Sequence, residues 1–473
     1  MEEERVGLSL AELSRRIHSG EVASLHATEE IFETIAHKDD TLNSFVTLLR
    51  DQALQASEAA DHMLRAGQDL GPLHGVPINV KDIFATKGIR TTAGSKILGE
   101  WVPDEDATVI TRLLRAGALL VGKTNMHEFA FGVTTENPFY GVTRNPWDPE
   151  RVPGGSSGGS GASVAAGMGY ATLGTDTGGS IRIPAALCGI VGLKPTYGRV
   201  SRHGVVPLAW SLDHVGPLTR TAEDAAIVLQ AIAGHDTKDP ASSRRPVDDY
   251  LATINDPIDR LTIGVPAEPF WDPIQPEVAS AARAGIDVLK GLGVTVVEVE
   301  FPWADQLPSL QPIILSEAAA YHHHWLQGPE AADYSLQLKT GLMQGAIIPA
   351  VDYVNAQRLR GDLRSDARDL FWRIDALAMP ALPIVAPKIG QSRLDVGGTE
   401  LETTRALTRN MSPFNLLGFP ALTVPCGFDS QELPVGLQIA GRPFEENLIL
   451  RIGHAYQQVT DWHKWRPPGD ATA

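Results

Sequence analysis

The sequence predicts an α/β protein: one large domain over residues 1–473, with a mixed, twisted central sheet covered by helices on both faces. The main observation is an alternation of short apolar runs, which suit buried strands, with amphipathic windows, which suit helices. The 473 residues, 43% of them hydrophobic and 21% charged, have the composition of a globular protein with a large core. No internal repeat or low-complexity tract divides the chain.

Residues 1–67 are expected to form a helical segment that packs on the rest of the domain. Ser9-Leu10-Ala11-Glu12 has the pattern of a capping box, in which a serine and a glutamate satisfy each other's backbone N–H groups at a helix start. Two further amphipathic stretches follow near 25–37 and 52–66.

Residues 71–220 form the expected core motif region, and the alternation continues beyond it. The expected strands are 76–80, 118–121, 170–174, 261–265, 294–300, 375–380, 421–425 and 434–440. The expected helices are 106–116, 157–168, 221–233, 275–290, 350–371 and 446–459. The proline-rich stretches 240–275 and 379–390 are expected to be long loops.

Charge and cysteine content exclude several classes of protein. The net charge of −17 argues against a nucleic-acid partner, which needs a basic surface. Cys188 and Cys426 are too few for a disulfide framework and suit a cytoplasmic protein, and the apolar setting of Cys188 predicts an inert core thiol. The acidic start at residues 1–5 does not resemble a signal peptide, and no apolar run of about 18 residues predicts a membrane span.

Three patterns invite other functions. Residues 117–124 fit a phosphate-binding loop, but their Ala-Leu-Leu-Val centre is typical of a buried strand. Residues 155–159 fit the nucleophile elbow of α/β hydrolases, which needs a strand directly before it, whereas 145–149 is a turn sequence. The histidines 322–324 cannot converge on one metal ion from a helix, because neighbouring side chains point about 100° apart. We therefore expect them to form a polar helix face.

Lys81 ends the apolar run Val76-Pro77-Ile78-Asn79-Val80. A lysine in a buried place loses its charge more easily, and a neutral lysine can act as a general base near neutral pH. A surface lysine at a strand end is the more common interpretation on composition alone, because lysine is mostly exposed.

Two glycine–serine turns, residues 154–160 and 175–180, contain the candidate nucleophiles. The second turn follows an expected strand and precedes a helical Ile-Arg-Ile-Pro sequence. The N-terminus of a helix offers unpaired N–H groups, which suit an oxyanion, and Ser180 would lie at its mouth. A plain tight turn between strand and helix is the alternative.

The two turns together, residues 154–160 and 174–185, resemble the defining stretch of the amidase signature family. Other stretches that match motifs of this family are 77–82, 122–129, 192–196, 213–217, 418–421 and 434–438. The resemblance covers nearly the whole chain.

The resemblance implies a Ser–Ser–Lys triad that hydrolyses an amide C–N bond through an acyl-enzyme. Ser180 would attack the carbonyl carbon, Ser156 would relay the proton, and Lys81 would be the base. The peptide bond between Gly155 and Ser156 is expected to be cis. By the same resemblance, no metal or organic cofactor is needed.

Other residues take supporting roles by the same resemblance. The N–H groups expected to hold the oxyanion belong to Thr177, Gly178, Gly179 and Ser180. Three residues are expected to brace the site: Ser157, Asp176 and Arg182. The acyl pocket is expected to be lined by Ala130, Phe131 and Gly132.

The family's substrates range from simple and aryl amides to carbamates, ureas and glutamine. In the glutamine-dependent member, which takes part in transfer-RNA amidation, an acidic residue ahead of the Pro-x-Asn segment holds the glutamine amino group. Residues 403–415 contain no carboxylate. We therefore expect a stand-alone hydrolase of a small aryl or alkyl amide, with Phe131, Trp210, Trp325 and Phe414 as candidate pocket walls. A carbamate or urea-type hydrolase and a glutamine-dependent amidotransferase component of the A type stay open, as does a homodimer.

Overall fold

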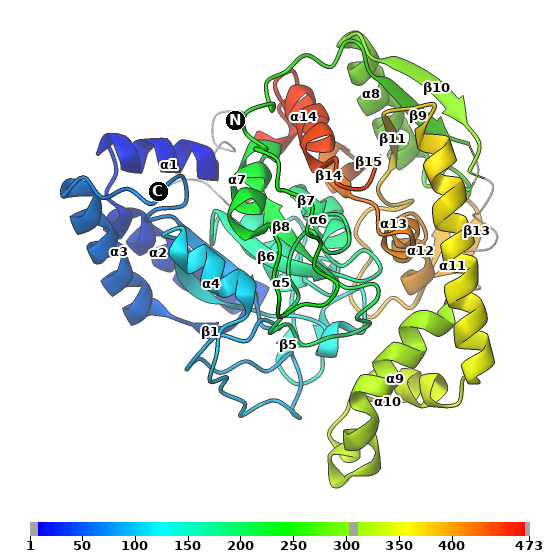
Figure 1. The fold of residues 1–473 in the computed structure, drawn as a ribbon, viewed down its shortest axis with the longest axis horizontal. Helices are drawn as coiled ribbons and strands as arrows, with labels where there is room; N and C mark the ends of the chain where they lie inside the picture. Colours follow the sequence, from blue (N-terminus) through cyan, green and yellow to red (C-terminus); the bar gives the residue numbers. More distant parts are fainter. Residues whose placement is uncertain (1–7, 268, 302–310, 469–473) are drawn as a thin grey trace.

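The structure is a computed structural model that describes residues 8–267, 269–301 and 311–468. Its centre is an 11-stranded mixed sheet with the order β1-β3-β2-β6-β8-β7-β14-β15-β11-β9-β10 (Figure 1). Neighbouring strands are parallel between β3, β2 and β6 and between β11, β9 and β10, and antiparallel elsewhere. The predicted α/β fold with a mixed central sheet is confirmed.

Eight of the eleven strands of the large sheet follow the expected apolar runs closely, whereas those at 45–48, 191–194 and 214–219 were not expected. They are β1 Phe45–Leu48, β2 Pro77–Lys81, β3 Leu119–Thr124, β6 Ala171–Asp176, β7 Val191–Lys194, β8 His214–Thr219, β9 Thr262–Pro266, β10 Thr295–Val299, β11 Ala376–Pro380, β14 Ala421–Phe428 and β15 Pro434–Gly441. Two small hairpins add β4 Glu136–Asn137 with β5 Gly141–Val142, and β12 Arg393–Val396 with β13 Thr399–Glu402.

All of the expected helices are also present. The helices are α1 Leu10–Ser19, α2 Ser24–Leu42, α3 Arg50–Arg65, α4 Thr108–Arg115, α5 Gly158–Ala165, α6 Arg182–Cys188, α7 Ala222–Ile232, α8 Pro276–Gly291, α9 Gln311–Gln327, α10 Leu336–Ala346, α11 Ala350–Phe371, α12 Thr403–Thr408, α13 Ser412–Leu417 and α14 Glu446–Gln457. No helix in the described ranges is long and apolar enough to cross a bilayer.

Helices cover both faces of the sheet, and β15 shows how. Successive side chains of a strand point to opposite faces. Gln438 accepts a hydrogen bond from Arg182 of α6 on one face. Its neighbour Leu437 lies against Gly285 of α8 on the other face, where α14 also packs on β15. Strands between two helical layers need apolar residues on both sides, which explains why β2, β3 and β6 are buried throughout.

The N-terminal helices lie together at one end of the molecule (Figure 1). The predicted capping box is present, with Ser9 Oγ accepting from the N–H of Glu12 at 3.1 Å. The backbone N–H of Ala11 donates to Asp224 of α7 at 2.9 Å, which ties α1 to the domain. The sequence pattern at residues 1–5 lies outside the described residues.

The expectation of a purely helical segment was wrong at residues 45–48. These residues form β1, which pairs antiparallel with β3 and completes one edge of the sheet. A strand of four residues is too short to show a two-residue period within a helical region.

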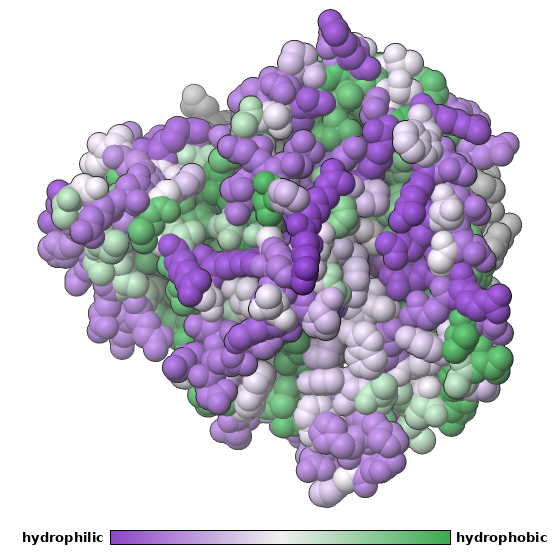
Figure 2. Space-filling model, in the orientation of Figure 1, coloured by the Kyte–Doolittle hydropathy of each residue, from purple (hydrophilic) through white to green (hydrophobic). Residues whose placement is uncertain are grey.

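Sequence reasoning placed residues 322–324 on a helix, but it predicted neither the extent of α9 nor the hairpin that α9 forms with α10. These two helices pack on each other and project from the body at the foot of α11 (Figure 1). Exposed apolar side chains occur where α10 passes into α11, at Ile347, Val351 and Val354. Figure 2 shows a hydrophobic area over this part of an otherwise largely hydrophilic face.

Candidate active site

Three chain segments meet at the buried end of Lys81. Lys81 is the last residue of β2, and its Nζ donates to Ser156 Oγ at 2.8 Å and to Thr175 Oγ1 at 2.8 Å. The side chains of Lys81 and Ser156 are fully buried. The structure therefore brings Lys81 and the first glycine–serine turn into direct contact, and it adds Thr175, which the sequence did not single out.

The environment of Lys81 favours the neutral amine. Burial lowers its pKa from the ordinary value near 10.5 to about 7. The carboxylates of Asp176 and Asp213 act in the opposite direction, but burial is the larger effect. An amine that is largely neutral just above pH 7 can accept a proton from the Ser156 hydroxyl.

The two glycine–serine turns are joined through Ser157. The N–H of Ser157 donates to the carbonyl of Ser180 at 3.3 Å, and its hydroxyl donates to the carbonyl of Thr175 at 3.2 Å. The peptide bond between Gly155 and Ser156 is cis, as the resemblance implied. Ser180 keeps only 6% of its surface exposed.

Asp176 ties the second turn to the start of α6. Its carboxylate accepts from the N–H of Gly179 at 2.8 Å and from Nε of Arg182 at 3.0 Å. Burial alone would raise the pKa of Asp176, but the adjacent guanidinium holds it well below its usual value. This carboxylate therefore remains charged and braces the turn.

The bond to Asp176 changes which N–H groups can face a ligand. The N–H of Gly179 is already used, whereas no hydrogen bond from those of Thr177, Gly178 and Ser180 occurs within the described residues. The Thr177 hydroxyl donates to Asp213 Oδ1 at 2.6 Å. The N–H of Gly179 therefore supports the turn, and the three N–H groups without a partner in the described residues form what we call its unpaired side.

The segment of the expected acyl pocket lies under α10. Ala130 ends a short 3₁₀ helix, and Gly132 packs so closely on the ring of His127 that an added Cβ would lie 2.3 Å from it. The ring of Phe131 meets α10 at Gly341, where a Cβ would lie 2.3 Å from Cζ of the phenylalanine. Sequence reasoning could not predict that α10 packs on Phe131, because the two segments lie far apart along the chain.

The candidate wall residues have different surroundings. Trp325 packs in an aromatic cluster with Phe129, at 5.9 Å between ring centres. Phe414 is fully buried in a core cluster, whereas Trp210 is 44% exposed and lines a separate pocket. That these aromatic side chains line one substrate pocket therefore stays a prediction.

The segment 403–415 does reach the site, at its second turn. Ser412, at the start of α13, donates to the carbonyl of Gly178 at 3.4 Å, and Met411 lies beside Gly179. Neutral side chains therefore occupy this position beside the turn.

The apparent alternatives have structural explanations. Lys123 of the phosphate-loop pattern is fully buried in β3, where its Nζ donates to the carbonyl of Phe84 at 2.6 Å. The three adjacent histidines lie on α9, and no cluster suited to a metal ion occurs within the described ranges. His322 is nevertheless a core residue, packed edge-on against Phe129, so the prediction of a uniformly polar helix face was wrong. Both cysteines are buried free thiols whose pKa is raised by burial.

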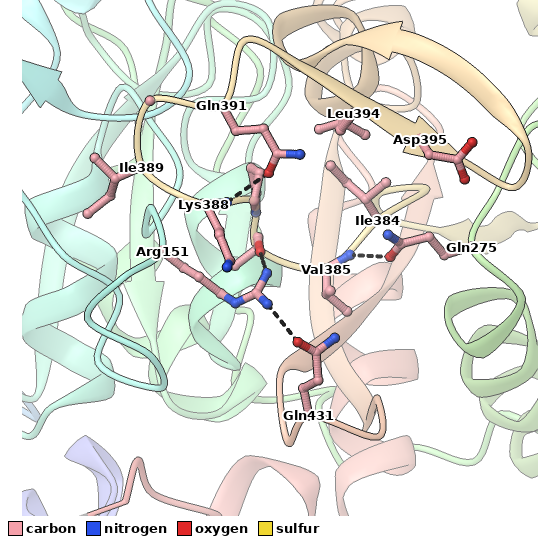
Figure 3. A pocket seen from close by; sticks show the side chains of 13 residues that line it. Arg151, Gln275, Ile384, Val385, Lys388, Ile389, Gln391, Leu394, Asp395 and Gln431 are labelled. Carbon is pink, nitrogen blue, oxygen red and sulfur yellow. Dashed lines mark hydrogen bonds between the residues drawn. The ribbon is translucent and has the colours of Figure 1, made fainter.

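A surface pocket of about 610 Å³ contains none of the predicted site residues (Figure 3). Its loop, residues 384–391, runs past Arg151 and Gln431. The guanidinium of Arg151 already donates to the carbonyl of Ala386 and to Oε1 of Gln431. We therefore locate the candidate active site at Lys81 and the two serine turns.

The sequence profile of the family described as Amidase matches residues 26–450. The chain belongs to the amidase signature family. Its fold is the amidase-signature fold, and the chain is an enzyme of this family, whose members act on carbon–nitrogen bonds.

Individual relatives cover the chain almost completely. The A subunit of glutamyl-tRNA(Gln) amidotransferase from Chloroflexus aurantiacus is 44% identical over 97% of this chain and 98% of its own length. A solved structure described as a vestigial protein complex that reveals the origins of an s-triazine catabolic enzyme is 36% identical, with a TM-score of 0.92 over 97% of this chain and 99% of that one. A bacterial aryl acylamidase of the amidase signature family is 28% identical, with a TM-score of 0.88 over 97% of each chain.

Proposed function

We propose that this enzyme hydrolyses a carboxamide with Ser180 as nucleophile, Ser156 as proton relay and Lys81 as general base. The observation that carries the proposal is the buried 2.8 Å contact between Lys81 Nζ and Ser156 Oγ. A serine hydroxyl is a weak nucleophile unless a base removes its proton. A lysine whose pKa is lowered to about 7 can be that base without a histidine.

The reaction proceeds in two halves. Ser180 Oγ attacks the amide carbon while its proton passes to Ser156 Oγ, and the proton of Ser156 passes to Lys81 Nζ. The relay then runs in reverse to protonate the leaving nitrogen, and the C–N bond breaks to give an acyl-enzyme. Water enters in place of the amine, loses its proton by the same route, and releases the carboxylic acid.

The second turn stabilises the negative oxygen that forms in each half. We place this oxygen on the unpaired side of the turn, against the N–H groups of Thr177, Gly178 and Ser180. The N–H of Gly179 supports the turn through Asp176 instead. Loss of one such donor typically lowers the rate about 10²–10³-fold.

The comparisons support the amide of glutamine as the substrate better than an aryl amide. The relatives at 44% identity are named as A subunits of an amidotransferase, and the match covers 97% of this chain. We therefore propose that the chain acts as an A-type component, which releases ammonia from glutamine and works with partner proteins. In this role it would have low activity alone.

One observation favours the stand-alone hydrolase as a second candidate. The side chains of the 403–415 segment beside the oxyanion turn include Met411 and Ser412, and this segment has no carboxylate to pair with the ammonium of glutamine. A neutral amide, carbamate or urea would not need that partner.

A substrate panel distinguishes the two candidates. Purified enzyme is assayed with glutamine, a primary aliphatic amide, an anilide, an ester, a carbamate and a urea, and release of ammonia or amine is measured. The A-type role predicts glutamine as the preferred substrate and co-purification with other subunits from the native cell. Ser180→Ala should abolish every activity, while Ala at the exposed Ser392 should change none. Full activity of Ser180→Ala would refute the mechanism whichever substrate is used.

A further inference from the structure

Helix α10 rests on the segment that leads into the expected acyl pocket. Oε1 of Gln337 lies 3.1 Å from Nε2 of His127, and one helical turn later Gly341 meets the ring of Phe131. Residues four apart lie on the same face of a helix. One face of α10 therefore contacts both ends of the segment 127–131.

The start of α10 is fixed to the same segment. The N–H of Ser335, which caps the helix, donates to Oε2 of Glu128 at 3.1 Å. The other carboxylate oxygen accepts from the hydroxyl of Ser95 at 2.8 Å. Glu128 is only 1% exposed, and a buried carboxylate is stable only with such donors. The position of α10 over the pocket segment is therefore well defined.

His127 connects this helix contact to the reaction centre. Its backbone N–H donates to the carbonyl of Ser156 at 3.1 Å, and its own carbonyl accepts from the N–H of Ala130 at 2.9 Å. Its ring lies directly on Gly132, where an added Cβ would be 2.3 Å from Cδ2 and Nε2. One residue thus contacts the proposed relay, the pocket segment and α10.

One hydrogen bond sets the orientation of the His127 ring. Burial lowers the pKa of His127, so the ring is neutral at neutral pH and carries a single N–H. Because the amide oxygen of Gln337 only accepts, this N–H is on Nε2. Nδ1 has no hydrogen-bond partner among the described residues. Gln337 itself is exposed, so its amide reaches the buried ring from the surface.

We propose that His127 and Gln337 form a positioning pair that determines which acyl groups the enzyme accepts. Held by Gln337, the His127 ring keeps Gly132 and its neighbour Phe131 in place, so the packing of α10 sets the shape of the acyl pocket. The inference rests on the proposed function, since it takes residues 130–132 as the lining of that pocket. Neither side chain of the pair exchanges a proton with the substrate.

Replacement of Gln337 tests the pair with little risk to the fold, because this side chain is exposed. Gln337→Met removes the acceptor, and His127→Phe keeps a ring but removes the donor. Each should raise KM about two- to tenfold, the value of one net hydrogen bond, with a smaller effect on kcat, because the substrate must then order the pocket segment itself. His127→Gln, which keeps an N–H donor, should have a KM closer to wild type than His127→Phe. Gln344→Met, also at an exposed position of α10, is the matched control and should leave KM unchanged.

Selectivity between acyl groups is the second readout. Glutamine and a primary aliphatic amide both release ammonia and differ only in their acyl part. The ratio of their kcat/KM values should move toward one by severalfold in Gln337→Met and stay constant in Gln344→Met, because a loosened pocket discriminates less. Partial unfolding would instead lower kcat for both substrates equally and leave both KM values unchanged.

The double variant His127→Phe/Gln337→Met completes the test. Because both changes remove the same hydrogen bond, its KM should equal that of either single variant, and fully additive effects would show that the two residues act separately. Unchanged KM and unchanged selectivity in Gln337→Met, with Ser180→Ala inactive, would overturn this inference alone. An active Ser180→Ala would overturn the proposed function instead.

Discussion

At the scale of single residues, the chemistry depends on one lysine that is held without charge. Lys81 ends a strand buried on both faces, so its amine is surrounded by protein on all sides. The opposing carboxylates of Asp176 and Asp213 keep its pKa from falling further. The result is a base with a pKa of about 7, which suits proton transfer near neutral pH.

Replacement of Lys81 by methionine should therefore remove the base while keeping most of its packing volume. We expect kcat to fall about 10²–10⁴-fold, the range typical of a lost general base. The same replacement at Lys87, which is exposed, is the matched control and should leave kcat unchanged. Steady-state kinetics on the best substrate of the panel provide the measurement, and wild-type activity in the Lys81 variant would contradict the assigned role.

The pH dependence of the reaction follows from the same group. Because the neutral amine is the active form, kcat/KM should rise with pH and level off above a midpoint of about 7. At lower pH the amine is protonated and cannot accept the proton of Ser156. A pH–rate profile recorded on the wild type tests this, and activity that is constant from about pH 5 to pH 9 would be incompatible with a lysine base.

Much of the candidate site could be predicted because its motifs are local in sequence. The turns around Ser156 and Ser180 and the strand ending at Lys81 each carry their signal within a few residues. Thr175 could not be recognised in the same way, since its significance comes from its contact with Lys81, far along the chain. The hydrogen bond from the Gly179 N–H to Asp176 could not be predicted either, because it forms only in the folded turn.

At the scale of secondary structure elements, strands between two helical layers were the most predictable. Strands such as β2, β3 and β11 are mostly apolar and buried along their whole length, since both faces of the sheet are covered. The extent of α9 and the whole of α10 were missed, because the buried positions include polar residues in α9 and glycines in α10, which do not form an apolar stripe. These two helices nevertheless matter, as α10 covers the predicted acyl pocket.

The contact between α10 and Phe131 gives a prediction at this scale. In Gly341→Ala the new Cβ would lie 2.3 Å from the Phe131 ring, so the ring must move. If Phe131 lines the acyl pocket, KM should change several-fold, with a smaller effect on kcat.

Gly361→Ala is the matched control. Gly361 lies within α11, and an added Cβ there meets no atom within 4 Å. Alanine favours a helix over glycine by about 1 kcal/mol, so this variant should be as stable as wild type or more stable, with unchanged KM. An unchanged KM in Gly341→Ala would remove Phe131 from the pocket.

At the scale of the whole molecule, we propose that the chain forms a single domain. One sheet runs from β1 near the N-terminus to β10, and α1 is bound to α7 through Ala11 and Asp224. Differential scanning calorimetry should show one unfolding transition. Asp224→Ala, which removes that link and the side-chain half of the capping box of α7, should lower its midpoint, since a lost capping interaction costs about 0.5–2 kcal/mol. A separate early transition for residues 1–67 would contradict the single domain.

The comparisons over the whole chain agree with the expected fold but favour a different substrate. The sequence favoured a stand-alone amidase, because residues 403–415 lack a carboxylate. The high identity to A subunits of an amidotransferase over 97% of the chain now supports glutamine better. Substrate choice depends on a few side chains around a shared reaction centre, so the motifs that indicate the family do not determine it.

The central claim is that Ser180 is the nucleophile and that Lys81 activates it. Covalent labelling with a fluorophosphonate, followed by mass spectrometry of the modified peptide, tests it most directly. The label should be found on Ser180, should be absent from Ser180→Ala, and should form much more slowly in Lys81→Met. A label on another serine, or undiminished labelling of Ser180→Ala, would contradict the account.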